Sequence, residues 1–125
     1  MSRRATLEKT FTQADFDAFA ALSGDDNPIH VDPDFSARTR FGRTVAHGAL
    51  LCSVLRGLVE EIVPGGRQIR QSTMYPAPSP AGEALRFQAE TTGETADRIT
   101  IALTVTRLAD GEVTCRGETE VAPCR

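Results

Sequence analysis

The segment from Gly48 to Val63 carries the longest apolar pattern in this chain of 125 residues. Its large apolar side chains recur every three or four residues, the spacing of side chains that share one face of an α-helix. They are Leu50, Leu51, Val54, Leu55, Leu58, Val59 and Ile62. The pattern predicts a central helix with a broad buried face, ended by the turn residues Pro64, Gly65 and Gly66. Such a helix needs another layer of structure to cover it.

The period of the apolar residues changes after residue 66. Residues 67–75 have the composition of a strand, and residues 76–82 form a proline-rich loop. Three further stretches alternate apolar and polar residues, which is typical of half-buried β-strands: 84–92, 98–108 and 112–121. Asp110-Gly111, between the last two, is a strong signal for a hairpin turn.

The first half of the chain is predicted to be mostly helical. Residues 6–11 alternate enough for a short strand, and Thr12 with Asp15 has the pattern of a helix N-cap, which predicts a helix over about 13–23. Pro28 makes residues 24–28 a loop. A short helix then begins at Asp32-Pro33 and ends near residues 41–42.

The order of these elements predicts an α+β domain. A strand, then helices, then four strands in meander-like succession favour helices packed on one antiparallel sheet. One long apolar helix against a curved antiparallel sheet is the hot-dog arrangement, although the same order also fits other α+β folds.

Length and composition favour one soluble domain over residues 1–125, since domains commonly have about 100–150 residues and 40% of this chain is hydrophobic. The formal net charge of -3 argues against a nucleic-acid binder, because a duplex-binding surface concentrates Lys and Arg. No stretch approaches the ~20 apolar residues of a membrane span, and the N-terminus lacks the apolar run of a secretion signal. Three cysteines without a Cys-x-x-Cys pair suggest neither a disulfide framework nor zinc. We expect a cytoplasmic protein.

The residues best suited to chemistry lie in the loop from Ser23 to Asp32. Asp25 and His30 are five positions apart, and Gly24 and Pro28 let the chain turn so that both side chains lie on one side. A carboxylate and an imidazole that share one water have the parts for general acid–base catalysis. Alone, each residue is more often structural: such an Asp caps a helix or forms a turn, and such a His is simply hydrogen-bonded.

Gly48 begins the long predicted helix, directly after Thr44-Val45-Ala46-His47. Free N–H groups at a helix N-terminus favour negative charge, and glycine lets another group approach the backbone. The Gly48 N–H could therefore hold a thioester carbonyl and stabilise the enolate-like oxygen that forms when water adds at the β-carbon. The alternative is a glycine that only permits close packing, and spacing alone does not separate the two.

Two motifs, in this order and at this separation, resemble one protein family. They are Ser-Gly-Asp-Asp-Asn-Pro-Ile-His-Val-Asp-Pro at 23–33 and Phe-Gly-Arg-Thr-Val-Ala-His-Gly at 41–48. Together they resemble the MaoC-like family, which includes the (R)-specific enoyl-CoA hydratases. The similarity runs from about Thr12 through the long helix and more weakly along the strands. It implies a hot-dog fold, with a long central helix wrapped by a curved antiparallel β-sheet, and a homodimer whose two sheets join.

The resemblance also assigns roles to individual residues. Asp25 and His30 match the catalytic pair, and Gly48 matches the glycine whose N–H contacts the thioester carbonyl. Asn27 is expected to fix the loop at the substrate site, and His47 to shape the turn that presents Gly48.

Arg56 departs from the pattern, because short-chain hydratases carry a small polar residue at this position of the helix. If this face lines the acyl pocket, Arg56 would narrow it or meet a polar acyl group, as a third substrate-binding residue beside Gly48 and Asn27. The alternative is that Arg56 extends to solvent.

The activity implied is reversible syn addition of water to a trans-2-enoyl-CoA, giving an (R)-3-hydroxyacyl-CoA. No metal is expected, because the only histidines, His30 and His47, make no ligand cluster with the cysteines. No separate cofactor is expected either, because coenzyme A enters as part of the substrate. Arg38, Arg40 or Arg43 could meet its phosphates, but acyl carrier protein also presents a phosphate, so the carrier stays open. Two alternatives stay open as well: a hot-dog acyl-CoA thioesterase, which needs a carboxylate aimed at the carbonyl carbon, and a non-catalytic acyl-thioester binding domain.

Overall fold

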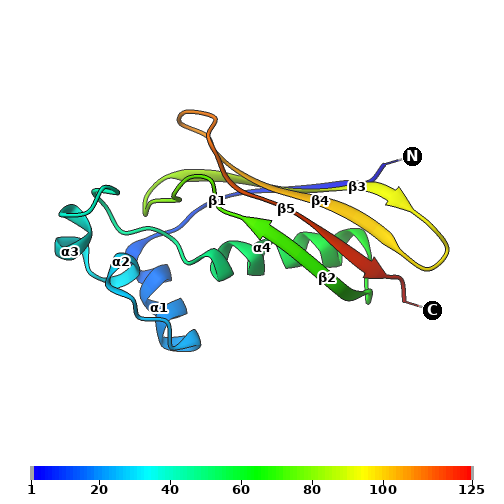
Figure 1. Cartoon of the computed structure of the whole chain (residues 1–125), viewed down its shortest axis with the longest axis horizontal. Coiled ribbons are helices and arrows are strands. Elements are labelled where there is room, and N and C mark those ends of the chain that lie inside the picture. The colour runs from blue at the N-terminus through cyan, green and yellow to red at the C-terminus, as the bar shows by residue number, and fades with distance from the viewer. Residues whose placement is uncertain (1, 125) are drawn as a thin grey trace.

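A five-stranded antiparallel sheet curves over one long helix in the computed structural model (Figure 1). The structure describes residues 2–124, so Met1 and Arg125 of the predicted domain lie outside the described residues. The helix is α4, Gly48–Ile62, and the strands are β1 Arg4–Thr10, β2 Arg67–Met74, β3 Ala84–Glu94, β4 Ile99–Arg107 and β5 Val113–Ala122. This is the α+β hot-dog arrangement that the sequence predicted.

The alternation within the strands decides which side chains face α4. In β4, Ile99, Ile101, Leu103 and Val105 are buried and the residues between them are partly exposed. α4 buries Leu51, Leu55, Leu58, Val59 and Ile62 in the same core. Each large side chain buried in this way contributes roughly 1.5–3 kcal/mol, so the predicted apolar face is what holds helix and sheet together. Within residues 2–124 there is no helix both long and apolar enough to cross a membrane.

The strand order, β1-β3-β4-β5-β2, corrects the predicted meander. β3, β4 and β5 follow one another as antiparallel neighbours, but β2 pairs with β5 and not with β3. The other side of β3 is taken by β1, from Arg4 opposite Glu90 to Thr10 opposite Ala84. This pairing joins segments that lie far apart in the sequence, and local alternation carries no information about it.

Three short helices gather beyond the end of the sheet where α4 begins (Figure 1). They are α1 Gln13–Ser23, α2 Pro28–Val31 and α3 Pro33–Ala37. The predicted capping box at the start of α1 is present, because the Thr12 hydroxyl accepts from the Asp15 N–H and the Asp15 carboxylate accepts from the Thr12 N–H.

Two helix predictions need correction. Residues 24–28 were expected to be loop throughout, but Pro28 begins α2, since proline at the first helical position loses no hydrogen bond. The helix that begins at Pro33 ends at Ala37 and not near residue 41. There the Thr39 hydroxyl donates to the Ser36 carbonyl and accepts from the Phe41 N–H, which turns the chain out of the helix.

Candidate active site

The loop between α1 and α2 carries Asp25 and is shaped by short-range contacts. α1 ends at Gly24, whose φ of 81° lies in the left-handed region that glycine adopts without a side-chain clash. The Asn27 side chain accepts from the Ile29 N–H at 3.2 Å and so caps α2, which carries His30. Asn27 does not line the neighbouring cavity, so its visible contact is with the loop itself.

The His30 ring is buried and held by one backbone carbonyl. Its Nδ1 lies 2.8 Å from the Val45 carbonyl oxygen. A carbonyl oxygen can only accept, so Nδ1 carries the proton of the neutral ring and Nε2 keeps its lone pair. His30 therefore presents a proton acceptor on the side away from Val45.

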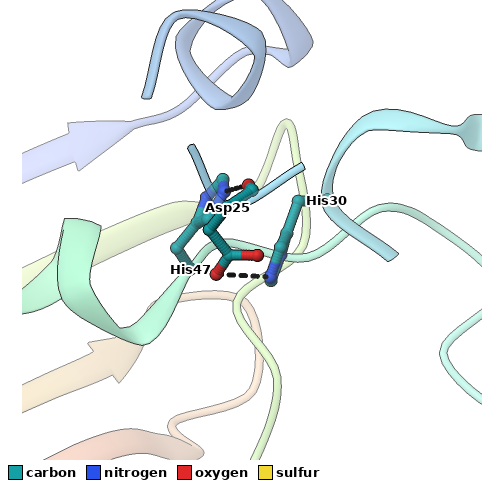
Figure 2. Close-up of side chains that lie close together, drawn as sticks. All are labelled: Asp25, His30 and His47. Carbon is teal, nitrogen blue, oxygen red and sulfur yellow. Dashed lines mark hydrogen bonds and ion pairs between the residues drawn. The ribbon is translucent and has the colours of Figure 1, made fainter. Parts of the chain in front are cut away.

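Asp25 lies on that side of His30. One Asp25 carboxylate oxygen is 3.9 Å from His30 Nε2, and the carboxylate is more than half exposed (Figure 2). This separation is too long for a direct hydrogen bond, but both atoms can contact a single small molecule such as water. The structure thus brings together the two residues that the sequence singled out, and a water held between them could give up a proton to either.

His47 connects this pair to the start of α4. Its Nε2 donates to the backbone carbonyl of Asp25 at 2.9 Å, and its ring stacks on the His30 ring with centroids 3.8 Å apart and planes at 21°. The Phe19 ring contacts His47 edge-on at 4.8 Å. The sequence analysis gave His47 only a role in the turn before Gly48. It missed the contacts with Asp25 and His30, because they join residues far apart in the chain.

Asp25, His30 and His47 also form a group of possible metal ligands, each with one ligand atom within 4.8 Å of the others. The sequence analysis expected no such cluster. The donor set is only partly available, since His30 Nδ1 and His47 Nε2 already donate to backbone carbonyls. The atoms without such a bond are His30 Nε2, the Asp25 carboxylate and His47 Nδ1, which is buried and has no hydrogen-bond partner among the described residues.

A cavity of about 670 Å³ opens beside His30, and Gly48 lies in its wall. As the first residue of α4, Gly48 has an N–H without a partner inside the helix. A Cβ at Gly48 would lie 2.5 Å from the Tyr75 ring, so a side chain here would force the half-exposed Tyr75 ring to move. The close-packing role considered from the sequence is therefore observed, and the cavity also gives the Gly48 backbone access to a ligand.

Arg56, on α4, is the third residue that the sequence suggested for substrate binding. It does not line the cavity, and it lies about two turns beyond Gly48 along α4. Its guanidinium donates to the Gly66 carbonyl at 3.3 Å and lies 3.8 Å from the Glu60 carboxylate. Arg56 would therefore not contact an acyl group bound in this cavity. It connects α4 to the turn that follows it.

Two of the three arginines considered as phosphate contacts do line the cavity. Arg40 lies over the Phe41 ring at 5.0 Å, and Arg43 lies 3.9 Å from the Glu83 carboxylate and donates to the Ala81 carbonyl. Arg38 is not part of the lining.

Comparison with known proteins identifies the family. The family model described as a MaoC like domain matches residues 1–113. The chain belongs to the MaoC-like family. This MaoC-like chain is 38% identical over 113 residues to the (R)-specific enoyl-CoA hydratase of Aeromonas caviae, which covers 89% of the chain and 84% of that protein. It is 32% identical over 124 residues to the (R)-specific enoyl-CoA hydratase of Rhodospirillum rubrum. This match covers 97% of the chain and 86% of that protein. A solved structure of an (R)-hydratase from A. caviae involved in PHA biosynthesis matches with a TM-score of 0.91 and 33% identity, covering 98% of this chain and 96% of that one.

Gln13 holds the part of α2 that carries His30 in this MaoC-like domain, and it was missed from the sequence. Its side-chain amide donates to the His30 carbonyl at 2.9 Å and accepts from the Thr44 hydroxyl at 2.6 Å. The Val45 N–H donates to the Ile29 carbonyl beside these bonds. Together the three bonds hold α2 against the segment that leads to Gly48. Only an interpretation that already placed α1 beside α2 could have found Gln13.

A second polar cluster of the MaoC-like domain surrounds Cys52, one turn beyond Gly48. The Cys52 Sγ lies 3.2 Å from the Tyr75 hydroxyl and accepts from the Gln71 amide at 3.3 Å. The Cys115 thiol, followed by Tyr75 and other donors, lowers the pKa of Cys52 to about 5, although partial burial opposes the shift. Burial, and then the neighbouring Cys52, raise the pKa of Tyr75 to about 12. At neutral pH the phenol therefore donates and the thiolate accepts.

Proposed function

We propose that this chain adds water reversibly to a trans-2-enoyl-CoA and gives an (R)-3-hydroxyacyl-CoA. The observation that carries the proposal is the Asp25 carboxylate 3.9 Å from His30 Nε2, beside a cavity that Gly48 lines. The two (R)-specific enoyl-CoA hydratases to which the chain is 38% and 32% identical support it.

The thioester carbonyl is held at the Gly48 N–H, where the helix terminus stabilises negative charge. Asp25 and His30 hold the water. As its oxygen bonds to the β-carbon, one of the pair accepts a water proton, and the electrons of the double bond move toward the thioester oxygen. The electrons then return from the thioester oxygen to the α-carbon, which takes a proton from the Asp25–His30 pair, so that one water has been added and the pair has the proton count with which it began. Because both catalytic groups lie on one side of the substrate, the two additions occur on the same face.

Every step is a proton transfer or an addition, so the proposed reaction needs no redox cofactor. Coenzyme A enters only as the thiol portion of the substrate. Arg40 and Arg43 at the cavity are the candidates for contact with its phosphates, and an acyl carrier protein would use the same positive charges.

The proposed assembly is a homodimer joined at β2. This strand pairs with β5 on one side, and most of its side chains are exposed, including Ile69. An unpaired strand edge invites pairing with another chain, and a second copy offers the same edge in an antiparallel arrangement. The cytoplasm is the proposed location, because the three cysteines are free thiols and suit a reducing compartment.

The test is an assay of crotonyl-CoA in which loss of the enoyl-thioester absorbance and release of free thiol are followed separately. The proposal expects hydration without thiol release, and a fall of about 10²–10⁴-fold in kcat for Asp25→Asn and for His30→Ala, since each removes a general acid–base group. Thiol release from the wild type at a rate similar to the loss of absorbance would point to a thioesterase instead.

A further inference from the structure

Ser79 lies in the wall of the cavity beside His30, and its hydroxyl has no partner in the fold. The residue is 3% exposed, and its Oγ is buried without a hydrogen bond to any group within residues 2–124. Among the residues that the structure describes, Ser79 is the only one lining this cavity whose side chain has such a buried, unpaired polar atom. Burial of an unpaired hydroxyl costs free energy. An unpaired hydroxyl in the wall of a cavity therefore points to a ligand that pairs with it.

The backbone on both sides of Ser79 is fixed, so the hydroxyl cannot move away to find another partner. Pro78 and Pro80 flank the serine, and each proline ring restricts its own backbone angle φ. The Pro78 carbonyl accepts from the Arg107 guanidinium at 2.8 Å, and Pro80 pairs with Val45 in an antiparallel bridge. Rotation of the side chain is the freedom that remains to Ser79.

Ser79 lies against the segment that leads from His30 to the start of α4. Its carbonyl accepts from the Ala46 N–H at 2.9 Å. The residue before Ala46 is Val45, whose carbonyl holds His30 Nδ1, and Gly48 follows two residues after Ala46. Ser79, His30 and Gly48 therefore line one cavity from neighbouring stretches of backbone.

We propose that the Ser79 hydroxyl donates a hydrogen bond to a carbonyl oxygen of the bound acyl thioester. The proposal rests on the proposed function, which brings such a substrate into this cavity. The substrate has two kinds of carbonyl oxygen, the thioester carbonyl held at Gly48 and the amide carbonyls of the pantetheine arm. Each of them accepts, and a serine hydroxyl donates equally well to either. They differ in one respect, because negative charge develops during the reaction on the thioester oxygen alone.

The test measures by calorimetry the Kd of butyryl-CoA, which has no double bond to hydrate. We expect Ser79→Ala to bind it roughly three- to ten-fold more weakly than the wild type, as for the loss of one hydrogen bond. Ser53→Ala is the matched control and should bind as the wild type does. Ser53 is exposed, does not line the cavity and donates its hydroxyl to the Leu50 carbonyl. An unchanged Kd in Ser79→Ala would overturn the proposal.

Hydration of crotonyl-CoA by Ser79→Ala distinguishes the two carbonyls. A bond to the thioester oxygen strengthens as charge develops, so its loss should lower kcat. A bond to an amide carbonyl does not change during the reaction, so its loss should raise KM and leave kcat unchanged. Either result supports the proposal. Absence of hydration by the wild type would overturn the proposed function, whereas weaker binding of butyryl-CoA by Ser79→Ala would still support the bond to the thioester.

Ser36→Ala is the control for the role of the hydroxyl in the fold. Ser36 is also buried and lies outside the cavity wall, but its hydroxyl donates to the Ile29 carbonyl at 3.3 Å. Its replacement should lower the denaturant midpoint of unfolding. Ser79→Ala removes a buried group without a partner, so its midpoint should equal or exceed that of the wild type. A midpoint lowered as much as in Ser36→Ala would mean that the fold itself pairs the Ser79 hydroxyl, and would overturn the proposal.

Discussion

His30 and His47 lie face to face, and each donates one N–H to a backbone carbonyl. These bonds fix the neutral tautomers, with the proton on Nδ1 of His30 and on Nε2 of His47. The geometry thus leaves His30 Nε2 as a base beside Asp25, with His47 as the group that positions both.

Replacement of His47 tests this positioning role. His47→Ala removes the bond to the Asp25 carbonyl and the stack on His30, so we expect kcat to fall roughly ten- to hundred-fold with a smaller change in KM. The free energy of unfolding should fall by about 1–3 kcal/mol, because the Asp25 carbonyl loses its donor. His47→Gln keeps an N–H donor and should recover part of kcat. A purely structural role would lower stability and leave the kcat of the folded enzyme unchanged.

At the scale of elements, the site depends on hydrogen bonds that join α1, α2 and the irregular segment before α4. α1 reaches the catalytic loop through Gln13, and the segment before α4 is held by backbone bonds from Val45 to Ile29 and from Ala46 to Ser79. These bonds determine where α4 begins relative to His30. The distance between Asp25 and His30 is thus set by the junction of α1, α2 and the start of α4.

Gln13 offers a direct check of that junction. Gln13→Ala should lower the free energy of unfolding by about 1–2 kcal/mol, because the His30 carbonyl and the Thr44 hydroxyl both lose their partner. Gln13→Glu keeps the acceptor for the Thr44 hydroxyl but lacks the donor to the His30 carbonyl. It therefore removes only the hydrogen bond to His30. Denaturant unfolding, followed by circular dichroism, measures the free energy of unfolding of both variants. If Gln13→Glu were as stable and as active as the wild type, the bond to His30 would have no positioning role.

The packing of α4 against β2 and β5 should depend on pH through Cys52. Its pKa is lowered in the fold from an ordinary 9.0 to about 5, chiefly by the Cys115 thiol and then by Tyr75. A thiol with a lowered pKa stabilises the fold fully above its unfolded pKa and loses this contribution as the pH falls through the folded pKa. The stability of the wild type relative to Cys52→Ser should therefore decline between pH 9 and pH 5. The stability of Cys124→Ser, which removes an exposed thiol, should change with pH as that of the wild type does. A stability difference between the wild type and Cys52→Ser that is constant with pH would exclude the thiolate.

At the scale of the whole molecule, the sheet leaves β2 as a largely exposed edge strand. Light scattering should give a mass near twice the 13.5 kDa of the chain if two copies join there. Ile69→Lys places a charge on this edge, which natural sheets use to prevent pairing, so it should shift the mass toward the monomer. A wild type that stays monomeric at all concentrations would rule out the proposed dimer.

Periodicity was enough to predict α4 and the strands, because burial of one face repeats at a fixed spacing within each element. It could not predict the place of β2, since strand order depends on pairings between distant segments. Asn27-Pro28 is ambiguous in sequence, because the same residues fit a loop and a helix start. Asp25 and His30 were predicted from one short motif, whereas Gln13, Tyr75 and the stacking of His47 depend on tertiary contacts. The sequence also could not show whether Arg56 borders the cavity, because a position on a helix does not show how far a cavity extends along it.

The most direct test of the catalytic pair is chiral analysis of the product formed from crotonyl-CoA by the wild type and by Asp25→Asn, which keeps the shape of the side chain but removes its charge. Hydration on one face by a water between Asp25 and His30 predicts a single product of the wild type, (R)-3-hydroxybutyryl-CoA. The folded Asp25→Asn variant should form almost none of it. Formation of the (S) product, of a mixture, or of the (R) product at an undiminished rate by Asp25→Asn would contradict the assignment.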